Sequence, residues 1–444
     1  MFHPVELILA MLAAAVGLGI LARKIRVAYP ILLVIGGLLL SLQPWAPDVH
    51  LDPQIVFFLF LPPLLYSAAF HTRWPEFRAQ LRAITMLAVG LVLFTTTLVA
   101  AAAHYWIGIP WGPAFVLGAI VSPPDAVAAM AVTQRLRVPR VVATLLEGES
   151  LVNDASALVA LRLAIGATAA GVFSIWDAGF QFVYVSAGGI AIGLLGGFLV
   201  IRLHNWLDLH NLVDAKLTIT ITLLTPFAVY LPAEHMHFSG VLAAVTAGLW
   251  VGSRCERVFS RELYQEARAV WEWVEFLLNS LIFILIGLML KAVLNGLDDR
   301  YSPVDLLLYS LGISGVVIAA RLIWMFPGAY IPRWLDRRIL GKSDRYPPWQ
   351  WVTVVGWTGM RGVVSLAAAM ALPLTMDDGK PFPNRDLIQF LTFWVIFATL
   401  VGQGLTLPLV IRVLGVSKAA EEEPEDERPA CHVEEPDAQA KEKD

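Results

Sequence analysis

Charged residues are scarce in this chain of 444 residues. Asp, Glu, Lys and Arg make up 15% of it, hydrophobic residues make up 57%, and the mean hydropathy is +0.67. Soluble domains average about 25% charged residues, so the composition excludes an ordinary soluble fold. Cysteine is almost absent too. Cys255 and Cys431 lie far apart in the sequence, which suggests neither a disulfide framework nor a cysteine-based metal site.

Catalytic signatures are also lacking. The sequence contains no nucleotide-binding fingerprint and no credible pairing of a nucleophile with a general base. We therefore predict that the chain is not an enzyme, that it has no cofactor and that it has no nucleic-acid partner. The partners that we expect are the lipid bilayer and small ions.

Apolar stretches that can cross a membrane are abundant. A spanning helix needs about 20 apolar residues, and the second and ninth of the stretches are short. We predict an all-α integral membrane protein with about 13 transmembrane helices. The stretches lie near residues 5–22, 29–42, 54–70, 84–106, 111–132, 141–168, 179–202, 213–231, 239–253, 270–294, 304–330, 350–374 and 387–413.

The connecting loops alternate in charge. Lys and Arg collect in every second loop, as in residues 23–26, 73–82 and 254–268, whereas residues 43–53 and 104–110 contain none. Because short cytoplasmic loops are rich in Lys and Arg, we expect a multi-pass protein of the plasma (inner) membrane with its C-terminus in the cytoplasm. An odd number of spans also permits two six-helix repeats of inverted topology.

The composition changes near residue 415. We divide the chain into a transmembrane domain, residues 1–415, and an acidic tail, residues 416–444. The tail is rich in Glu, Asp, Pro, Lys and Ala and poor in large apolar residues, which is typical of disorder.

Two consecutive prolines interrupt the predicted fifth span. Pro123 and Pro124 remove two backbone donors and clash with the preceding turn, so the helix has to break. Irregular backbone at membrane depth needs burial in protein or a watery cavity. We expect free backbone oxygens from Ser122 to Pro124 at a binding site, and Asp125 as the cap of the second half-helix. A plain proline kink is the alternative, but a carboxylate beside the break favours function.

The sixth span places several polar groups in one apolar helix. Offsets of three and four put Ser150, Asn153 and Asp154 on one face. A hard cation such as Na⁺ prefers oxygen ligands, and we take Asp154 and Ser150 as its metal ligands. Burial disfavours the charged form of a carboxylic acid, so Asp154 can hold either a proton or a cation. The alternative is that these residues only join helices.

The twelfth span contains Gly356, Gly359 and Gly362 around a single arginine, Arg361. An unpaired guanidinium in a membrane is costly, and we predict that Arg361 forms a structural pair with Glu149. Interruptions in corresponding helices of two repeats indicate a transporter site at their interface. We expect the fifth, sixth and twelfth spans to meet there.

Other ionisable residues are less informative. Arg162, Arg321, Glu272 and Glu275 lie in spans or at their ends, and interhelical pairing or snorkelling is the favoured interpretation. We expect His71 to be solvated at a span end rather than to act as a pH sensor.

The segments Ser-Pro-Pro-Asp-Ala (122–126), Glu-Ser-Leu-Val-Asn-Asp (149–154) and Gly-Met-Arg-Gly (359–362) resemble the cation:proton antiporter-1 family. This family comprises bacterial and archaeal sodium/proton antiporters related to eukaryotic exchangers, and the resemblance covers about residues 5–415. It implies thirteen helices with unwound, crossed helices 5 and 12, a homodimer, and elevator-like alternating access.

The resemblance also implies roles for single residues. Asp154 would carry the ion and the proton, with Ser150 and backbone oxygens of the fifth span as co-ligands. Asn153 would steady the crossing, and Asp125 would balance the half-helix ends. The Asn-Asp pair is associated in this family with electroneutral exchange.

Two positions depart from the family pattern. Ser67 stands where many relatives have a Glu in the ion site, and Pro124 stands where a Thr is common. Both changes leave the predicted ion-binding set, which includes Ser67, poorer in side-chain oxygen.

We therefore predict a secondary active transporter that exchanges a monovalent cation, with Na⁺ as the first candidate, for H⁺. Asp154 is its shared carrier. A K⁺/H⁺ antiporter of the same fold is the near alternative. A cation channel, which would conduct without coupling to pH, or an ion-sensing membrane receptor, which would bind ions without flux, are the alternatives from other classes.

Overall fold

The computed structural model describes residues 4–43, 56–133, 136, 138–170, 175–255, 259–297, 301–340, 346–376 and 379–417. Within these ranges the chain is helical, and its only β-structure is an isolated bridge between Thr375 and Pro381. The all-α prediction is confirmed. The predicted tail lies outside the described residues except for residues 416 and 417.

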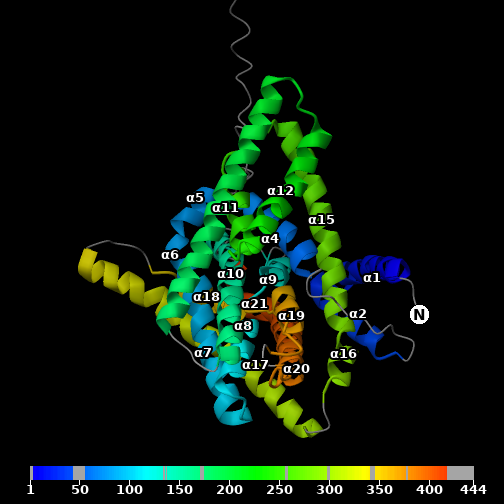
Figure 1. Ribbon diagram of the computed structural model, residues 1–444, viewed down its shortest axis with the longest axis vertical. Helices are drawn as coiled ribbons and strands as arrows, with labels where there is room; N and C mark the ends of the chain where they lie inside the picture. Colours follow the sequence, from blue (N-terminus) through cyan, green and yellow to red (C-terminus); the bar gives the residue numbers. More distant parts are fainter. Residues whose placement is uncertain are drawn as a thin grey trace, which may run out of the picture.

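The helices follow one another with short connections (Figure 1). In chain order they are α1 (Pro4–Ile25), α2 (Tyr29–Ser41), η1 (Val56–Phe60), α4 (Leu61–His71), α5 (Trp74–Ala79), α6 (Leu81–Thr85), η2 (Met86–Leu91), α7 (Val92–Ala102), η3 (Ala103–Ile107), α8 (Trp111–Val121), α9 (Ala126–Thr133), α10 (Arg140–Ala170), α11 (Ile175–Leu209), α12 (Ala215–His235), α13 (Gly240–Gly252), α15 (Arg261–Leu288), α16 (Leu290–Asn295), α17 (Pro303–Leu335), η5 (Asp336–Leu340), α18 (Trp349–Trp357), α19 (Val363–Met370), α20 (Arg385–Phe397), η6 (Ala398–Gln403) and α21 (Gly404–Val413).

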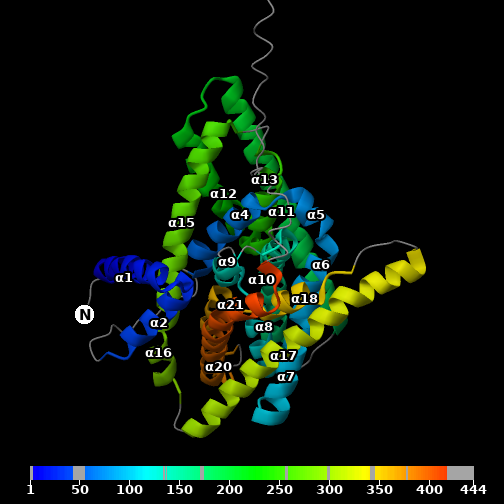
Figure 2. The ribbon, with the colours of Figure 1, turned by 180° about the vertical axis from the view of Figure 1, so that it is seen from behind.

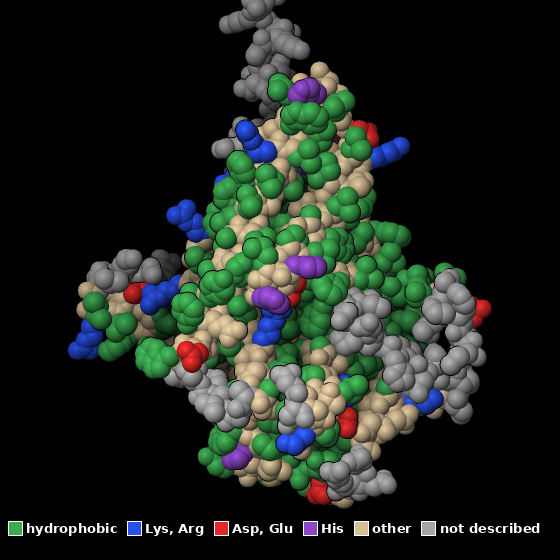
Figure 3. All heavy atoms as spheres, viewed as in Figure 1, with side chains coloured by type: hydrophobic (Ala, Val, Ile, Leu, Met, Phe, Trp, Pro, Cys, Tyr) green, Lys and Arg blue, Asp and Glu red, His purple; other side chains and the backbone are tan. Residues whose placement is uncertain are grey.

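Nine helical stretches in the described ranges are long and apolar enough to cross a membrane. Three shorter apolar helices, Tyr29–Ser41, Phe57–His71 and Gly240–Gly252, fall at the predicted second, third and ninth spans. The total of thirteen spans stays a prediction. Figure 3 shows hydrophobic side chains over most of the visible face and few charged ones, as expected for a surface in contact with lipid.

Two groups of helices make up the molecule. In one, α1 and α2 pack along α15, and α4 packs with α11, α12 and α13. In the other, α7, α8 and α10 pack together, and α17 packs with α7, α18 and α20. Both ribbon views show α1 and α2 beside α15, with α8 and α10 near the centre (Figures 1 and 2).

Glycines allow the close helix contacts within the first group. A Cβ atom at Gly287 of α15 would lie 2.5 Å from the backbone nitrogen of Leu38 in α2. A Cβ atom at Gly248 of α13 would lie 2.6 Å from the carbonyl oxygen of Tyr66 in α4. Small residues let membrane helices approach this closely.

Candidate functional site

The two predicted helix breaks meet in space. Helix α8 ends at Val121 and α9 begins at Ala126, while α18 ends at Trp357 and α19 begins at Val363. The backbone N–H of Asp125 donates to the carbonyl of Met360 at 2.6 Å. Both breaks are therefore confirmed, and the irregular segments cross so that four half-helix ends lie together within the protein.

Arg361 satisfies the carbonyl ends of this crossing. Its side chain is fully buried. Its Nε donates to the carbonyl of Val121 at 2.9 Å, Nη2 to that of Ser122 at 3.4 Å, and Nη1 to that of Gly359. Helix C-termini carry partial negative charge and unpaired carbonyls, so one guanidinium stabilises the ends of both α8 and α18.

The predicted ion pair between Glu149 and Arg361 is wrong. Glu149 of α10 instead forms a bidentate ion pair with Arg321 of α17, with N–O distances of 2.5 and 2.8 Å. Both side chains are 1% exposed, and Arg321 also donates to the carbonyl of Val355. The sequence offered more than one intramembrane arginine for this carboxylate. Carbonyl oxygens satisfy Arg361, which leaves Glu149 to Arg321.

Asp125 stabilises the opposite, N-terminal ends. Its Oδ1 accepts from the N–H of Val127 at 2.8 Å, and the N–H of Val363 also hydrogen-bonds its carboxylate. Gly362 has no side chain that could block this approach, because a Cβ atom there would overlap the carboxylate. Asp125 therefore caps α9, as predicted, and α19 as well.

Two residues of α10 hold the irregular segment of the fifth span. Nδ2 of Asn153 donates to the carbonyl of Pro124 at 3.0 Å, and Oγ of Ser150 accepts from the N–H of Ala126 at 3.4 Å. The Asn153 contact fits the steadying role that the family resemblance implies.

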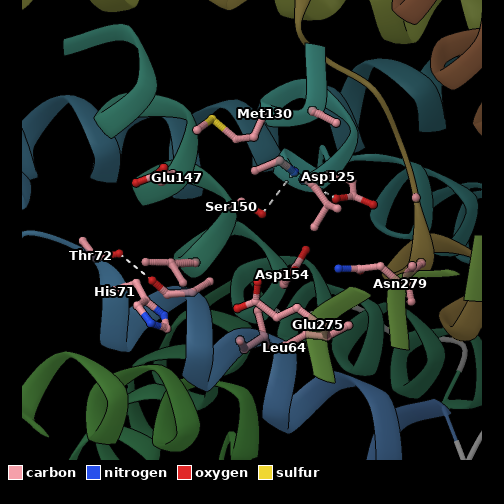
Figure 4. A pocket seen from close by; sticks show the side chains of 18 of the residues that line it. Leu64, His71, Thr72, Asp125, Met130, Glu147, Ser150, Asp154, Glu275 and Asn279 are labelled. Carbon is pink, nitrogen blue, oxygen red and sulfur yellow. Dashed lines mark hydrogen bonds between the residues drawn. The ribbon is translucent and has the colours of Figure 1, made fainter. Parts of the chain in front are cut away.

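Asp154, unlike the polar residues described above, has no structural partner among the residues that the structure describes. It is 7% exposed, and within the described part of the chain its carboxylate has no hydrogen-bond partner. It lines a cavity of about 770 Å³ together with Pro123, Pro124, Asp125 and Ser150 (Figure 4). Ser67, by contrast, does not line this cavity, and its buried hydroxyl lies 3.3 Å from Nδ1 of His71.

The cavity is more polar than the sequence indicates. Besides Tyr29 of α2 and Tyr264 of α15, its other polar lining residues come from α4, α5, α10, α15 and α19 and from the segment between α4 and α5. His71, expected in solvent, is among them, and its Nε2 is buried without a partner. The polar lining residues from these elements are His71, Thr72, Arg73, Glu76, Thr144, Glu147, Arg268, Glu272, Glu275, Asn279 and Ser365.

The interpretation of the remaining charged residues as pairs is confirmed for some of them. Arg162 of α10 contacts Glu234 of α12 at 2.6 Å, which joins the two helix groups. Glu272 contacts Arg268 of its own helix at 2.9 Å. Glu275 lines the cavity.

This geometry suits reversible binding of a small cation. No group of three His, Cys, Asp or Glu side chains among the described residues is arranged to hold a metal ion. At the crossed helices the site offers one free carboxylate, Asp154, while Glu147 and Glu275 line other parts of the cavity. Because one carboxylate accommodates one proton or one monovalent ion, the two ligands compete.

Broken, crossed helices around a buried carboxylate define a secondary transporter. Residues 8–413 match the family model described as "Sodium/hydrogen exchanger, transmembrane". The chain belongs to this family.

Curated relatives and solved structures agree with this assignment. An uncharacterized Na⁺/H⁺ exchanger of Mycobacterium tuberculosis is 38% identical over 412 residues, which cover 91% of this chain and 73% of the relative. A sodium, potassium, lithium and rubidium/H⁺ antiporter of Bacillus pumilus is 34% identical, over 91% of this chain and 60% of its own length. The sodium proton antiporter MjNhaP1 from Methanocaldococcus jannaschii has the same fold, with a TM-score of 0.67 at 19% identity over 94% of this chain and 99% of that one.

The Glu149–Arg321 pair predicts a strong energetic coupling. Glu149→Gln or Arg321→Gln leaves one charge buried without its partner, which costs about 3–5 kcal/mol. The double variant should lose less stability than the sum of the two single variants. Thermal unfolding of the purified protein in detergent measures this. Arg268 and Glu272 are the control pair, since they are 51% and 63% exposed and should show little coupling. Additive losses at Glu149 and Arg321 would argue against the pair.

Arg361 should behave independently of Glu149. Arg361→Gln leaves the carbonyls of α8 and α18 without their donor, and we expect a lower midpoint of thermal unfolding. Combining it with Glu149→Gln should not restore that midpoint, because the two side chains do not pair. Rescue by the double variant would support the pairing that the structure contradicts.

Proposed function

We propose that this protein is a secondary active antiporter that exchanges a monovalent cation for H⁺, with Asp154 as the shared carrier. One observation carries the proposal. The carboxylate of Asp154 alone, among the acidic groups beside the crossed helices, is free of hydrogen bonds within the described residues and faces a cavity. Its neighbours Asp125 and Glu149 are occupied by backbone donors and by Arg321.

Competition for one carboxylate couples the two fluxes. A proton and a cation cannot both occupy Asp154, so each crossing carries one or the other. The neighbouring Asn153 is uncharged and is engaged with Pro124. One positive charge therefore moves in each direction, and the exchange is electroneutral.

Na⁺ is the first candidate for the cation, and K⁺ is the alternative. The mycobacterial relative is named as a Na⁺/H⁺ exchanger, and the Bacillus pumilus relative as an antiporter of sodium, potassium, lithium and rubidium. Ser67 does not line the cavity and Pro124 has no hydroxyl, so neither position supplies a side-chain oxygen that could discriminate between the two ions.

The cavity also supports an orientation in the membrane. Arg73 and Arg268 line it. Arg73 belongs to a connection rich in Arg, and Arg268 lies in the N-terminal turns of α15, after another such connection. Such loops remain in the cytoplasm, so the cavity opens to the cytoplasm and the C-terminus lies there. By resemblance to its family, the protein works as a homodimer in the plasma membrane, with one helix group moving against the other.

Replacing the carrier tests the proposal directly. Asp154→Asn keeps the size of the side chain but can neither release a proton nor neutralise a cation. We expect it to abolish the collapse of an imposed pH gradient by Na⁺ or K⁺ in everted vesicles. Asp208→Asn, an exposed position on α11, is the matched control and should remain active. Normal exchange by Asp154→Asn would contradict the mechanism.

The stoichiometry gives a second test. In proteoliposomes, a membrane potential of either sign should leave the rate of Na⁺-driven proton movement unchanged, because no net charge crosses. A rate that follows the potential would contradict electroneutral exchange. Cation conductance without proton movement would identify a channel, and ion binding without any flux would identify a receptor.

A further inference from the structure

Helix α15 presents a polar stripe to the cavity. Arg268, Glu272, Glu275 and Asn279 are spaced by four, three and four residues, which places them on one face, and all four line the cavity. The helix then continues with residues 282–288, which are apolar or glycine and are buried. The polar stripe therefore ends at Asn279, which is 5% exposed.

The side-chain oxygen of Asn279 is buried but has no hydrogen-bond partner among the described residues. Its Oδ1 is buried and unpaired in the described part of the molecule, and the side chain points from α15 into the cavity (Figure 4). Buried polar atoms in native proteins almost always have a partner, and exceptions indicate a missing water, ion or functional role. A rotation of 180° about the Cβ–Cγ bond exchanges the oxygen and the nitrogen, which turns the carbonyl oxygen to the cavity.

The residues predicted as co-ligands supply few free oxygens for a cation. Asp125 and Ser150 accept hydrogen bonds from the backbone of α9, and Ser67 does not line the cavity. Asp154 provides one free carboxylate, and the buried hydroxyl of Ser365 is unpaired. Hard cations need several oxygen ligands. Glu147 and Glu275 also line the cavity, but a neutral amide oxygen adds a ligand without a second exchangeable charge.

We propose that Asn279 is a ligand of the transported cation, that its amide oxygen completes the coordination begun by Asp154, and that it sets the preference among monovalent cations. The inference rests on the proposed function. Helix α15 belongs to the group that contains α2, whereas α10 belongs to the other group. The ligand set therefore spans both groups, and it is complete only in the relative position seen here.

The test measures transport by the purified full-length protein in proteoliposomes with Na⁺, Li⁺ or K⁺. Asn279→Ala should raise the apparent KM for the transported cation about tenfold with little change in kcat, because it removes binding without touching the carrier. Asn279→Asp adds a second charge and should shift selectivity toward the smaller ions. Ser280→Ala is the control: Ser280 is also buried and unpaired, but does not line the cavity, and KM should not change.

Each outcome decides between the two proposals. Wild-type KM values in Asn279→Ala for all three ions, with Asp154→Asn inactive, would overturn the role of Asn279 and leave antiport intact. An equal rise of KM in Ser280→Ala would also overturn it, since the effect would then be one of helix packing. If Asn279→Ala is not recovered as a monodisperse protein, the near-isosteric Asn279→Asp decides, and unchanged selectivity overturns the inference. A wild-type protein that exchanges no cation would overturn the proposed function itself.

Discussion

The structure depends on satisfying helix ends inside a membrane. Breaking α8 from α9 and α18 from α19 leaves carbonyls and N–H groups without helical partners at membrane depth, where unpaired backbone groups are costly. Arg361 binds the carbonyls of Val121 and Gly359, and Asp125 accepts from the N–H groups of Val127 and Val363. Each charge thus serves two half-helices. Their opposite charges meet opposite helix dipoles, which stabilises the crossing.

This division of tasks frees Asp154. The other charged groups near the crossing are committed, because Glu149 is held by Arg321 and Asp125 by the backbone. A carboxylate that has no structural partner can exchange its ligand at little cost to the fold. The neutral amide of Asn153 holds the break at Pro124 and adds no second exchangeable charge. In the proposed mechanism, structural stability and reversible ion binding therefore fall to different side chains within two turns of α10.

Several features could be predicted from local sequence because their causes are local. Pro123 and Pro124 break a helix wherever they stand, and three glycines weaken the helix around Arg361. The 3- and 4-residue spacing of Ser150 and Asp154 puts them on one face of any α-helix. The pairing of Glu149 could not be predicted this way. Arg321 lies on α17, 172 residues away in the chain, and only packing decides which arginine reaches the carboxylate and which one binds carbonyls.

The sequence by itself determined that the chain is an all-α membrane protein, which helices break, and that Asp154 is the carboxylate to consider, because hydrophobicity, proline and buried charge act through local chemistry. Only the tertiary structure decided the partners. It placed Arg361 on the helix ends, removed Ser67 from the cavity, and brought the polar face of α15 to the same cavity as Asp154. These outcomes follow from how separate helices pack, and no spacing within one helix encodes them.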